Sequence, residues 1–487
     1  MGMPQKTAGD GAATARERLK AFRELAGLAA VKRGYRNDFF LADLLNMDLA
    51  AESHGLSAAE LRRSWLAYAD RLKRAKEKHL LQLYIGTPYC RSRCAYCIYF
   101  HNAGTPAALE KYKDALLASI KYYSAVFGKL VFENVYFGGG SPGLFSEAQL
   151  RQLCAALKSR VRWSADGERS FEFNPDSVTP AKLRIVAEAG FNRASFGVQS
   201  FNGEALRAIG RGRQTEKMVE EAVRWAREAG FSCVNLDLML GLPRDGGDNL
   251  AASFGKAAAL APDSIMLYPC KPAPRYLEKC FGGDAGRFRA ALRRHGARLR
   301  AVAALAARGG FVPREKLSAA LLEERNASAI RFFGPGHKET APHYAFSMPG
   351  RPMSIFGLGH HANSRIHGVL NYYSRPLAAD PARNTYRGVR EDGRRGMTAF
   401  VLEELGRGRT IPLKKFRGLF GVSPETAFPE AVSLLKALGK VRVRGGSVAL
   451  LAKTPRDRFT HAMFFLPYEE VSASLRNLRE GATERTD

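Results

Sequence analysis

The chain has 487 residues, of which 46% are hydrophobic and 25% are charged, a composition typical of a globular protein with two or three domains. It contains no run of about 18 apolar residues, and its start, MGMPQKTAGDGAATARERLK, has no apolar stretch of the kind that a secretory signal needs. We therefore expect no transmembrane segment, no secretory signal and a cytoplasmic location. The formal net charge of +28 leaves four interpretations open: binding to nucleic acid, to an anionic membrane surface or to an acidic substrate, or simply a solvated basic surface.

Residues 1–79 are predicted to form a helical and basic N-terminal extension rather than a catalytic region. Apolar residues recur at helical spacing around 19–29 and again around 61–72. Basic residues cluster here and in one later stretch, at Arg62, Arg63, Arg71, Lys73, Arg74, Lys76 and Lys78, and at Arg287, Arg289, Arg293, Arg294, Arg298 and Arg300. Both clusters have a spacing that fits a helix.

Six predicted strands alternate with amphipathic helices over residues 80–285. The strands are expected at 80–86, 130–139, 170–175, 194–200, 233–243 and 264–270. Two intervening helices end in the letters EAGF, which put Gly190 and Gly230 where a helix end favours a left-handed residue. Six successive βα units predict an α/β fold with a parallel sheet in an open or partial barrel, and chemistry at the carboxyl ends of its strands.

Residues 286–487 are predicted to form a C-terminal α+β domain. Helices are expected near 397–406, 412–420 and 424–438, followed by a hairpin over 440–453. This order is typical of a winged-helix-like unit. Together with the positive charge, such a unit would be compatible with DNA binding.

Three of the seven cysteines, Cys90, Cys94 and Cys97, fall in the stretch YCRSRCAYC soon after the first predicted strand. Structural zinc normally takes four ligands, and no second cysteine pair completes this set. A [4Fe–4S] cluster held by three cysteines leaves one iron open to an outside ligand, and this is the interpretation that we favour. The remaining cysteines are expected to be thiols outside any disulfide framework: Cys154, Cys233, Cys270 and Cys280.

Glycine-rich and polar motifs follow the later predicted strands. The segment YFGGGSPGLF contains three consecutive glycines at 138–140, whose missing side chains would let the backbone approach the ammonium group of a ligand. Four polar residues lie at strand ends or in the loops that follow: Glu172, Gln199, Arg211 and Asp237. Because arginine pairs with carboxylates, and acid or amide groups pair with ribose hydroxyls, this set suits a zwitterionic nucleoside.

The spacing Cys-x3-Cys-x2-Cys, with Tyr96 before the last cysteine, resembles the signature of the radical S-adenosylmethionine (SAM) superfamily. The motifs GGGSP, NPD, SFGVQSF, IGRGR and DLMLGLP, taken in order, look like those of the oxygen-independent coproporphyrinogen III oxidase (HemN- and HemW-like) family over roughly residues 80–465. The resemblance implies a cluster that cleaves SAM to a 5′-deoxyadenosyl radical. It also implies that SAM contacts Tyr84, Tyr96, Gly138, Gly139, Gly140, Ser141, Glu172, Gln199, Arg211 and Asp237, with Arg211 on the carboxylate and Asp237 on the ribose.

Three departures from that family bear on the reaction. Gly86 and Tyr99 stand where the oxidase usually has a histidine and a fourth cysteine, and the segment HYAFSMPGRP over 343–352 lacks the chaperone motif His-Asn-x-x-Tyr-Trp. These absences favour a class C radical SAM methyltransferase, which uses two SAM molecules to methylate an sp² carbon. The alternative is a coproporphyrinogen III oxidase-like oxidoreductase, and a further alternative is a haem- or nucleic-acid-binding protein without turnover.

The resemblance also carries expectations for partners. The substrate would be a flat conjugated small molecule, acidic or membrane-held ones included, and the electron donor a flavodoxin or a ferredoxin. His360 and His361 would serve as a proton acceptor or contact the second SAM, against the simpler interpretation of loop histidines. Residues 286–487 would be a HemN-like lid over the barrel, which we favour over DNA binding, and the chain is expected to be a monomer.

Overall fold

The computed structural model describes residues 14–25, 54–74, 78–97, 99, 102–244, 247–271, 273–313, 330–335, 352–390, 393–406, 409–469, 471–472 and 475–476. The chain divides into two compact units. The barrel unit comprises Ser53–Glu323 and Ala327–Arg390, and the C-terminal unit comprises Met1–Glu52, Glu324–Asn326 and Glu391–Asp487. The boundaries predicted after residues 79 and 285 do not separate these units, because strands from both flanking regions join the barrel sheet.

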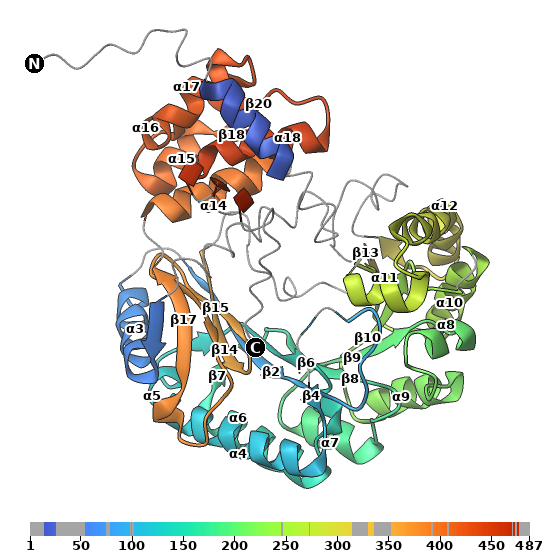
Figure 1. Cartoon of the computed structure of the whole chain (residues 1–487). Coiled ribbons are helices and arrows are strands. Elements are labelled where there is room, and N and C mark those ends of the chain that lie inside the picture. The colour runs from blue at the N-terminus through green and yellow to red at the C-terminus, as the bar shows by residue number, and fades with distance from the viewer. Residues whose placement is uncertain are drawn as a thin grey trace, which may run out of the picture. The chain divides into compact units, whose positions relative to one another are not determined.

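Six neighbouring parallel strands form the centre of the barrel unit (Figure 1). In sheet order they are β2 (Leu80–Thr87), β6 (Asn134–Gly139), β8 (Arg169–Phe173), β9 (Arg193–Gln199), β10 (Cys233–Leu240) and β11 (Ser264–Pro269). Every predicted strand is present, although the stretch 130–139 divides into β6 and the separate strand β5 (Val131–Phe132), which pairs with β7 (Arg162–Trp163). The parallel pairing confirms the predicted α/β fold with a partial (βα)6 barrel.

Helices connect these strands, and α4, α6, α7 and α9 lie on the outer side of the curved sheet (Figure 1). The connecting helices are α4 (Pro106–Tyr122), α5 (Ser124–Phe127), α6 (Glu147–Arg160), α7 (Pro180–Glu188), α8 (Gly203–Ala208), α9 (Glu216–Glu228) and α10 (Gly247–Ala259). Four of them begin at a hydroxyl side chain that accepts from a backbone N–H three residues on: Thr105, Ser146, Thr179 and Thr215. The predicted glycine ends are confirmed, because Gly190 and Gly230 have φ angles of 102° and 87°.

The sheet extends beyond the six predicted strands at both edges. β14 (Met353–Gly359) pairs in parallel with β2, and β15 (Asn363–Ile366), β16 (Leu370–Ser374), β17 (Thr385–Arg390) and β1 (His54–Ser57) follow in antiparallel order. At the other edge β13 (Ile330–Phe333) and β12 (Val312–Pro313) continue from β11. The sheet thus has 13 strands within the described ranges, and residues 353–390, assigned above to the C-terminal domain, complete the barrel unit.

The helix predicted around residues 61–72 also belongs to the barrel unit. This helix, α3 (Ala58–Leu72), buries Trp65 completely and stacks its ring near Phe356 of β14, with ring centroids 4.8 Å apart. The Trp65 indole N–H donates to the Tyr372 hydroxyl of β16 at 2.7 Å. The predicted apolar face is therefore confirmed, but it packs into the barrel core rather than forming a separate lead-in.

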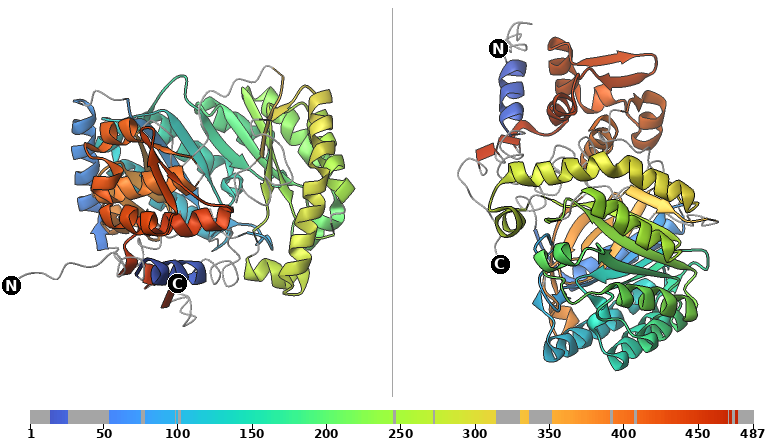
Figure 2. Two further views of the ribbon diagram at one scale, coloured as in Figure 1. Left: turned by 90° about the horizontal axis from the view of Figure 1, so that it is seen from above. Right: turned by 90° about the vertical axis from the view of Figure 1, so that its right-hand side faces the viewer.

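Two helices follow β11: α11 (Pro274–Phe281) and the 24-residue α12 (Ala285–Arg308), which is the long yellow helix in Figure 2. All six arginines of the second basic cluster lie on α12, as the predicted helical spacing requires. The buried face of α12 contributes Phe288 and Ala291 to an apolar cluster that also contains Ala95 and Leu206. Among the residues described, no helix has the length and apolar character needed to cross a bilayer.

The C-terminal unit has the predicted winged-helix-like order. It contains α14 (Gly393–Gly406), β18 (Ile411–Pro412), α15 (Leu413–Phe420), α16 (Pro424–Ala427), α17 (Pro429–Ala437), β19 (Val441–Arg444), β20 (Ser447–Leu450) and α18 (Pro455–Ala462), with strand order β18-β20-β19. The helix of residues 14–25, dark blue in Figures 1 and 2, packs into this unit. Phe22 meets Phe464 edge-on with ring centroids 4.9 Å apart, and Arg18 pairs with Glu430 at 2.7 Å.

Candidate functional site

The three motif cysteines lie in the segment between β2 and α4, here called the cysteine loop, at the carboxyl edge of the barrel sheet. Cys90 is in the two-residue strand β3 (Tyr89–Cys90). Cys90, Cys94 and Cys97 are each half-buried, whereas Cys154 and Cys270 are buried. The loop is fixed by its backbone: Gly104 N–H donates to Cys90 O at 2.9 Å, Cys97 N–H to Cys94 O at 3.2 Å, and Ala95 N–H to Ile209 O at 3.0 Å. Three accessible thiols are therefore held in one ordered loop.

The donor set of this loop fits an iron–sulfur cluster better than a single metal ion. Two of the sulfurs already accept hydrogen bonds, Cys90 Sγ from Ser141 Oγ at 3.5 Å and Cys94 Sγ from Arg211 Nε at 3.3 Å. Among the described residues no three His, Cys, Asp or Glu side chains are grouped closely enough to hold one ion. Three thiols in one short segment suit a cluster, in which each thiolate would bind an iron of its own. Burial raises the pKa of the Cys90 thiol to about 11, so binding of the cluster would release protons.

The glycine run packs against the chain that leads into the cysteine loop. Gly140 N–H donates to Thr87 O at 2.5 Å and Ser141 N–H to Tyr89 O at 2.7 Å. A Cβ added at Gly140 would lie 2.4 Å from Tyr89 O, so only glycine permits this approach. Gly139 combines a φ of 102° with a similar conflict, 2.8 Å from Thr87 O. The expected approach of these glycines to a ligand ammonium stays a prediction, whereas their packing role is visible.

Glu172 on β8 lies beside the glycine run. Its carboxylate accepts from the Tyr136 hydroxyl and from Gly139 N–H, the latter at 3.0 Å. A Cβ at Gly138 would fall 2.6 Å from Glu172 Oε2, so the missing side chain makes room for this carboxylate. Burial, opposed by the hydrogen bond from Tyr136 and assisted by the charge of Asp237, raises the pKa of Glu172 to about 7. Tyr84 of β2 stacks on Tyr136 with ring centroids 6.0 Å apart.

Asp237 lies on β10 and is held by its neighbours in the sheet. Asn235 Nδ2 donates to Asp237 Oδ1 at 2.7 Å, and Ser195 Oγ donates to Oδ2 at 3.4 Å. Burial raises the pKa of Asp237, and the Arg193 guanidinium opposes this shift. The charge of Asp237 also raises the pKa of Glu172, so these two residues form a pair of interacting carboxyl groups within the barrel.

Gln199 is the last residue of β9, and Arg211 comes later in the chain, after α8. Gln199 has a φ of 69°, an uncommon value for a residue with a side chain, at the point where the pairing of β9 with β10 shifts register. Arg211 follows α8, and its guanidinium donates to Cys94 Sγ, to Gly197 O at 2.5 Å and to Asn174 Oδ1 at 3.0 Å. The predicted carboxylate-binding arginine is therefore held directly against the cysteine loop.

Tyr96 packs into the apolar cluster that includes Leu206 and Phe288, so it anchors the cysteine loop to α8 and α12. Its burial raises the pKa of the phenol well above the usual range, and the Arg211 charge opposes the shift. The structure therefore gives Tyr96 a packing role, and a direct contact with SAM stays a prediction.

The two histidine candidates, His360 and His361, follow β14. Because Gly359 lies opposite Gly86 in the sheet, His360 reaches the same edge as the cysteine loop. His360 Nδ1 accepts from the Leu377 N–H at 3.2 Å, and its ring meets Tyr112 edge-on at 4.9 Å. Burial lowers the pKa of His360 to about 4, which keeps the ring neutral. These contacts are those of a packed histidine, and the proton-acceptor role stays a prediction.

Sequence reasoning assigned no role to Asn174 or Tyr136, although both touch predicted site residues. Asn174 lies in the quoted motif FEFNPD, two residues after Glu172, and its amide contacts Ser141 and Arg211. The alternation of β6 indicates that Tyr136 shares the face of Gly138. The segment that replaces the chaperone motif lies outside the described residues up to residue 351.

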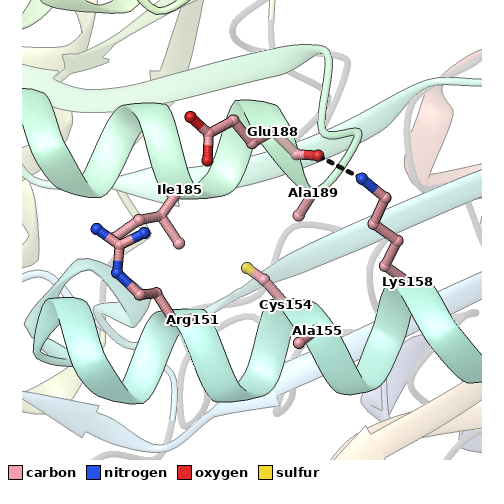
Figure 3. Close-up of a pocket in the computed structure, with 7 residues that line it drawn as sticks. All are labelled: Arg151, Cys154, Ala155, Lys158, Ile185, Glu188 and Ala189. Carbon is pink, nitrogen blue, oxygen red and sulfur yellow. Dashed lines mark hydrogen bonds between the residues drawn. The ribbon is translucent and has the colours of Figure 1, made fainter.

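A cavity of about 160 Å³ opens between α6 and α7, away from these motifs (Figure 3). The Cys154 sulfur points into it, and Lys158 Nζ donates to Glu188 O across its end at 2.9 Å. None of its lining residues belongs to a loop at the carboxyl edge of the sheet. We therefore place the candidate site at the cysteine loop and not at this cavity.

Comparisons with known proteins concern the region of the chain that contains the cysteine loop. Residues 84–253 match the model of the Radical SAM superfamily, so this part of the chain is a radical SAM domain. In sequence the chain resembles an oxygen-independent coproporphyrinogen III oxidase of Paracoccus denitrificans, with 33% identity over 191 residues, 39% of this chain and 42% of that one. It also resembles the heme chaperone HemW of Bacillus subtilis, with 34% identity over 193 residues, 39% of this chain and 51% of that one.

These alignments span about two fifths to one half of the relatives' length. In fold the chain is similar to the coproporphyrinogen III oxidase HemN of Escherichia coli, with a TM-score of 0.64, 22% identity, and coverage of 83% of this chain and 93% of that one. The chain therefore contains a region that matches the Radical SAM superfamily, within a fold like that of HemN. The two relatives named above are an oxygen-independent coproporphyrinogen III oxidase and a heme chaperone. Neither of these two relatives is named a methyltransferase.

Proposed function

We propose that the protein is a radical SAM oxidoreductase that removes hydrogen from a side chain of a tetrapyrrole, in the manner of coproporphyrinogen III oxidase. The observation that carries this proposal is the ordered loop of Cys90, Cys94 and Cys97 beside Ser141 and Arg211. The oxidase relatives favour this reaction over the methylation that the sequence departures suggested. On this proposal the departures at Gly86 and Tyr99 do not define the reaction class.

Three cysteines would hold the cluster, and the residues around them would hold SAM. Bound together, the cluster and SAM supply one-electron chemistry that can abstract hydrogen from an unactivated C–H bond. Arg211 presents a fixed cation for a carboxylate, while Glu172 and Asp237 offer acceptors for ammonium or hydroxyl groups. The two SAM molecules per turnover belong to the methylation scheme and are not part of this proposal. A small acidic electron-transfer protein such as flavodoxin or ferredoxin would supply the electron.

The test is an anaerobic assay of the reconstituted, reduced chain with coproporphyrinogen III and SAM that carries a CD₃ group. An oxidase should give unlabelled 5′-deoxyadenosine, because its added hydrogen atom comes from a propionate side chain. The substrate radical then passes one electron to an added one-electron acceptor and loses CO₂ to leave a vinyl group. Cys94→Ala should abolish 5′-deoxyadenosine, whereas Cys233→Ala, at a half-buried thiol outside the motif, should not. Deuterated 5′-deoxyadenosine together with S-adenosylhomocysteine would contradict the proposal and restore methyl transfer.

A second candidate is a haem-binding protein without turnover. The likeness to the HemW chaperone supports it, as does Tyr99, which is 69% exposed next to the cysteine loop and would offer an aromatic face or a phenol to a flat ligand. Stoichiometric haem binding, combined with no loss of CO₂ from coproporphyrinogen III, would favour this candidate. Weakened haem binding in Tyr99→Ala would locate the site.

A further inference from the structure

A continuous chain of hydrogen bonds joins two of the three motif cysteines. Ser141 Oγ donates to Cys90 Sγ at 3.5 Å, and Asn174 Nδ2 donates to Ser141 Oγ at 2.6 Å. At the other end Arg211 Nη2 donates to Asn174 Oδ1 at 3.0 Å, while Arg211 Nε donates to Cys94 Sγ at 3.3 Å. These side chains come from three different loops at the carboxyl edge of the sheet, so the chain of bonds is a built feature of the barrel.

The orientation of the Asn174 amide determines which group is the donor in each of these hydrogen bonds. A guanidinium can only donate, so the amide oxygen must face Arg211 and the amide nitrogen must face Ser141. Since Asn174 already donates to Ser141 Oγ, the single hydroxyl proton of Ser141 stays free for Cys90 Sγ. A carboxylate at position 174 would accept from both neighbours, would draw the Ser141 proton to itself, and would leave Cys90 without this donor.

The third cysteine, Cys97, differs from the other two in its hydrogen bonding. Among the described residues, the hydrogen bond recorded for Cys97 Sγ is to Tyr99 O at 3.9 Å, in which the sulfur is the donor and would lose this bond as a thiolate. Among the described residues, protein donors would therefore stabilise two sulfurs of the proposed cluster, those of Cys90 and Cys94. Hydrogen bonds to cluster sulfurs stabilise the more negative, reduced form and so raise the reduction potential.

We propose that Asn174 is a positioning residue that sets the reduction potential of the cluster by directing the Ser141 proton to Cys90 and holding Arg211 on Cys94. The inference rests on the cluster of the proposed function. A merely structural role for Asn174 would change stability or cluster content but would leave the potential of the assembled cluster unchanged.

The test compares reconstituted full-length variants by redox titration followed with electron paramagnetic resonance, with iron content measured on the same samples. Ser141→Ala should lower the potential, and Ser141→Thr, which keeps the hydroxyl, should retain the wild-type value. Asn174→Asp has two effects: it adds a negative charge, and it replaces the amide donor that faces Ser141 with an acceptor. To separate them, its effect on the potential is measured in two backgrounds, the wild-type chain and the Ser141→Ala variant. Its shift should be larger in the wild-type chain than in the Ser141→Ala variant, because only the serine has a proton to redirect.

Equal shifts of Asn174→Asp in both backgrounds, or a wild-type potential in Ser141→Ala, would overturn the inference. If Asn174→Asp assembles no cluster, the Ser141→Ala and Ser141→Thr pair still decides, because only Ser141→Thr keeps the hydroxyl that accepts from Asn174 and donates to Cys90. A wild-type chain that binds no iron would instead overturn the proposed function, so the two failures are distinguishable.

Discussion

Gly138, Gly139 and Gly140 differ in what their missing side chains make possible. Gly138 leaves room for the Glu172 carboxylate, and Gly139 adopts a left-handed φ, while Gly140 lets two backbone segments touch. The run of three glycines identifies this loop in the sequence, but the sequence alone does not show which atom a side chain at each position would clash with. The partners, Thr87 and Tyr89, come from a part of the chain about 50 residues earlier.

A first prediction concerns Gly140→Ala. The added Cβ would lie 2.4 Å from Tyr89 O and 2.8 Å from Thr87 O, so backbone must move, and we expect a loss of roughly 1–3 kcal/mol in the free energy of unfolding. The matched control is Gly255→Ala in α10, where nothing lies within 4 Å, and helix propensity should give a gain of about 0.5–1 kcal/mol. Denaturant unfolding of the cluster-free chain measures both. Equal stability of the two variants would contradict the packing role.

Glu172 provides a pH-dependent prediction. Burial raises its pKa to about 7, so over an interval of pH the folded chain keeps a proton that the unfolded chain, with a pKa near 4.5, has lost. Stability should therefore be highest below about pH 4.5 with respect to this group, and should fall as pH rises towards 7, by about 1–3 kcal/mol in all.

Glu172→Gln should flatten this part of the stability profile, because the amide has the same shape and does not titrate. The exposed Glu220→Gln on α9 is the control and should leave the profile unchanged. Chemical denaturation of the cluster-free chain at several pH values gives the slopes. An unchanged slope in Glu172→Gln would show that Asp237 or another group carries the dependence.

At the scale of elements, local patterns predicted the six central strands and their helices, because alternation and helical period are properties of short stretches. They could not predict that β14 pairs with β2, since Met353 lies opposite Leu80 and no local signal names a distant partner. For the same reason the sequence predicted residues 1–79 as a separate extension, whereas α3 and β1 belong to the barrel unit. The site followed from motifs, and its unpredicted member, Asn174, matters through contacts with distant residues.

The placement of α3 makes a prediction for Trp65→Ala. Trp65 is fully buried against Phe356 and hydrogen-bonded to Tyr372, so its loss should lower the stability of the barrel unit by about 3–5 kcal/mol. The half-buried Trp225 on α9 is the control, and Trp225→Ala should cost less. Thermal or denaturant unfolding is the measurement. A small effect at Trp65 would mean that residues 54–72 are a detachable extension after all.

At the scale of the whole molecule, the chain makes two units, and the C-terminal one includes the helix of residues 14–25. Neither the period of that helix nor the winged-helix-like pattern after residue 393 indicates that they pack together. The contacts Phe22–Phe464 and Arg18–Glu430 join positions more than 400 residues apart. The proposals that the chain is cytoplasmic and monomeric concern this scale too, and sedimentation would test the second.

Phe22→Ala should destabilise the C-terminal unit and spare the barrel unit. Phe22 is 1% exposed and packs on Phe464, so the expected loss is about 3–5 kcal/mol. Limited proteolysis with mass spectrometry should then show faster cleavage after residue 393 and an unchanged core over 102–244. Arg18→Ala, which removes an ion pair with the exposed Glu430, is the milder control and should change stability by less than about 1 kcal/mol. Faster cleavage throughout the chain would contradict the independence of the two units.

The pairing of β14 with β2 has a consequence for biosynthesis. β2 leaves the ribosome early, but its partner on one side is made only about 270 residues later, when Met353–Gly359 emerges. At synthesis rates of about 5–20 residues per second, that edge waits for roughly 15–55 s. During this time a buried apolar strand has an unpaired edge that could pair with a neighbouring nascent chain. The newborn protein should therefore depend on chaperones during translation, and slowing the ribosome before residue 353 should increase aggregation.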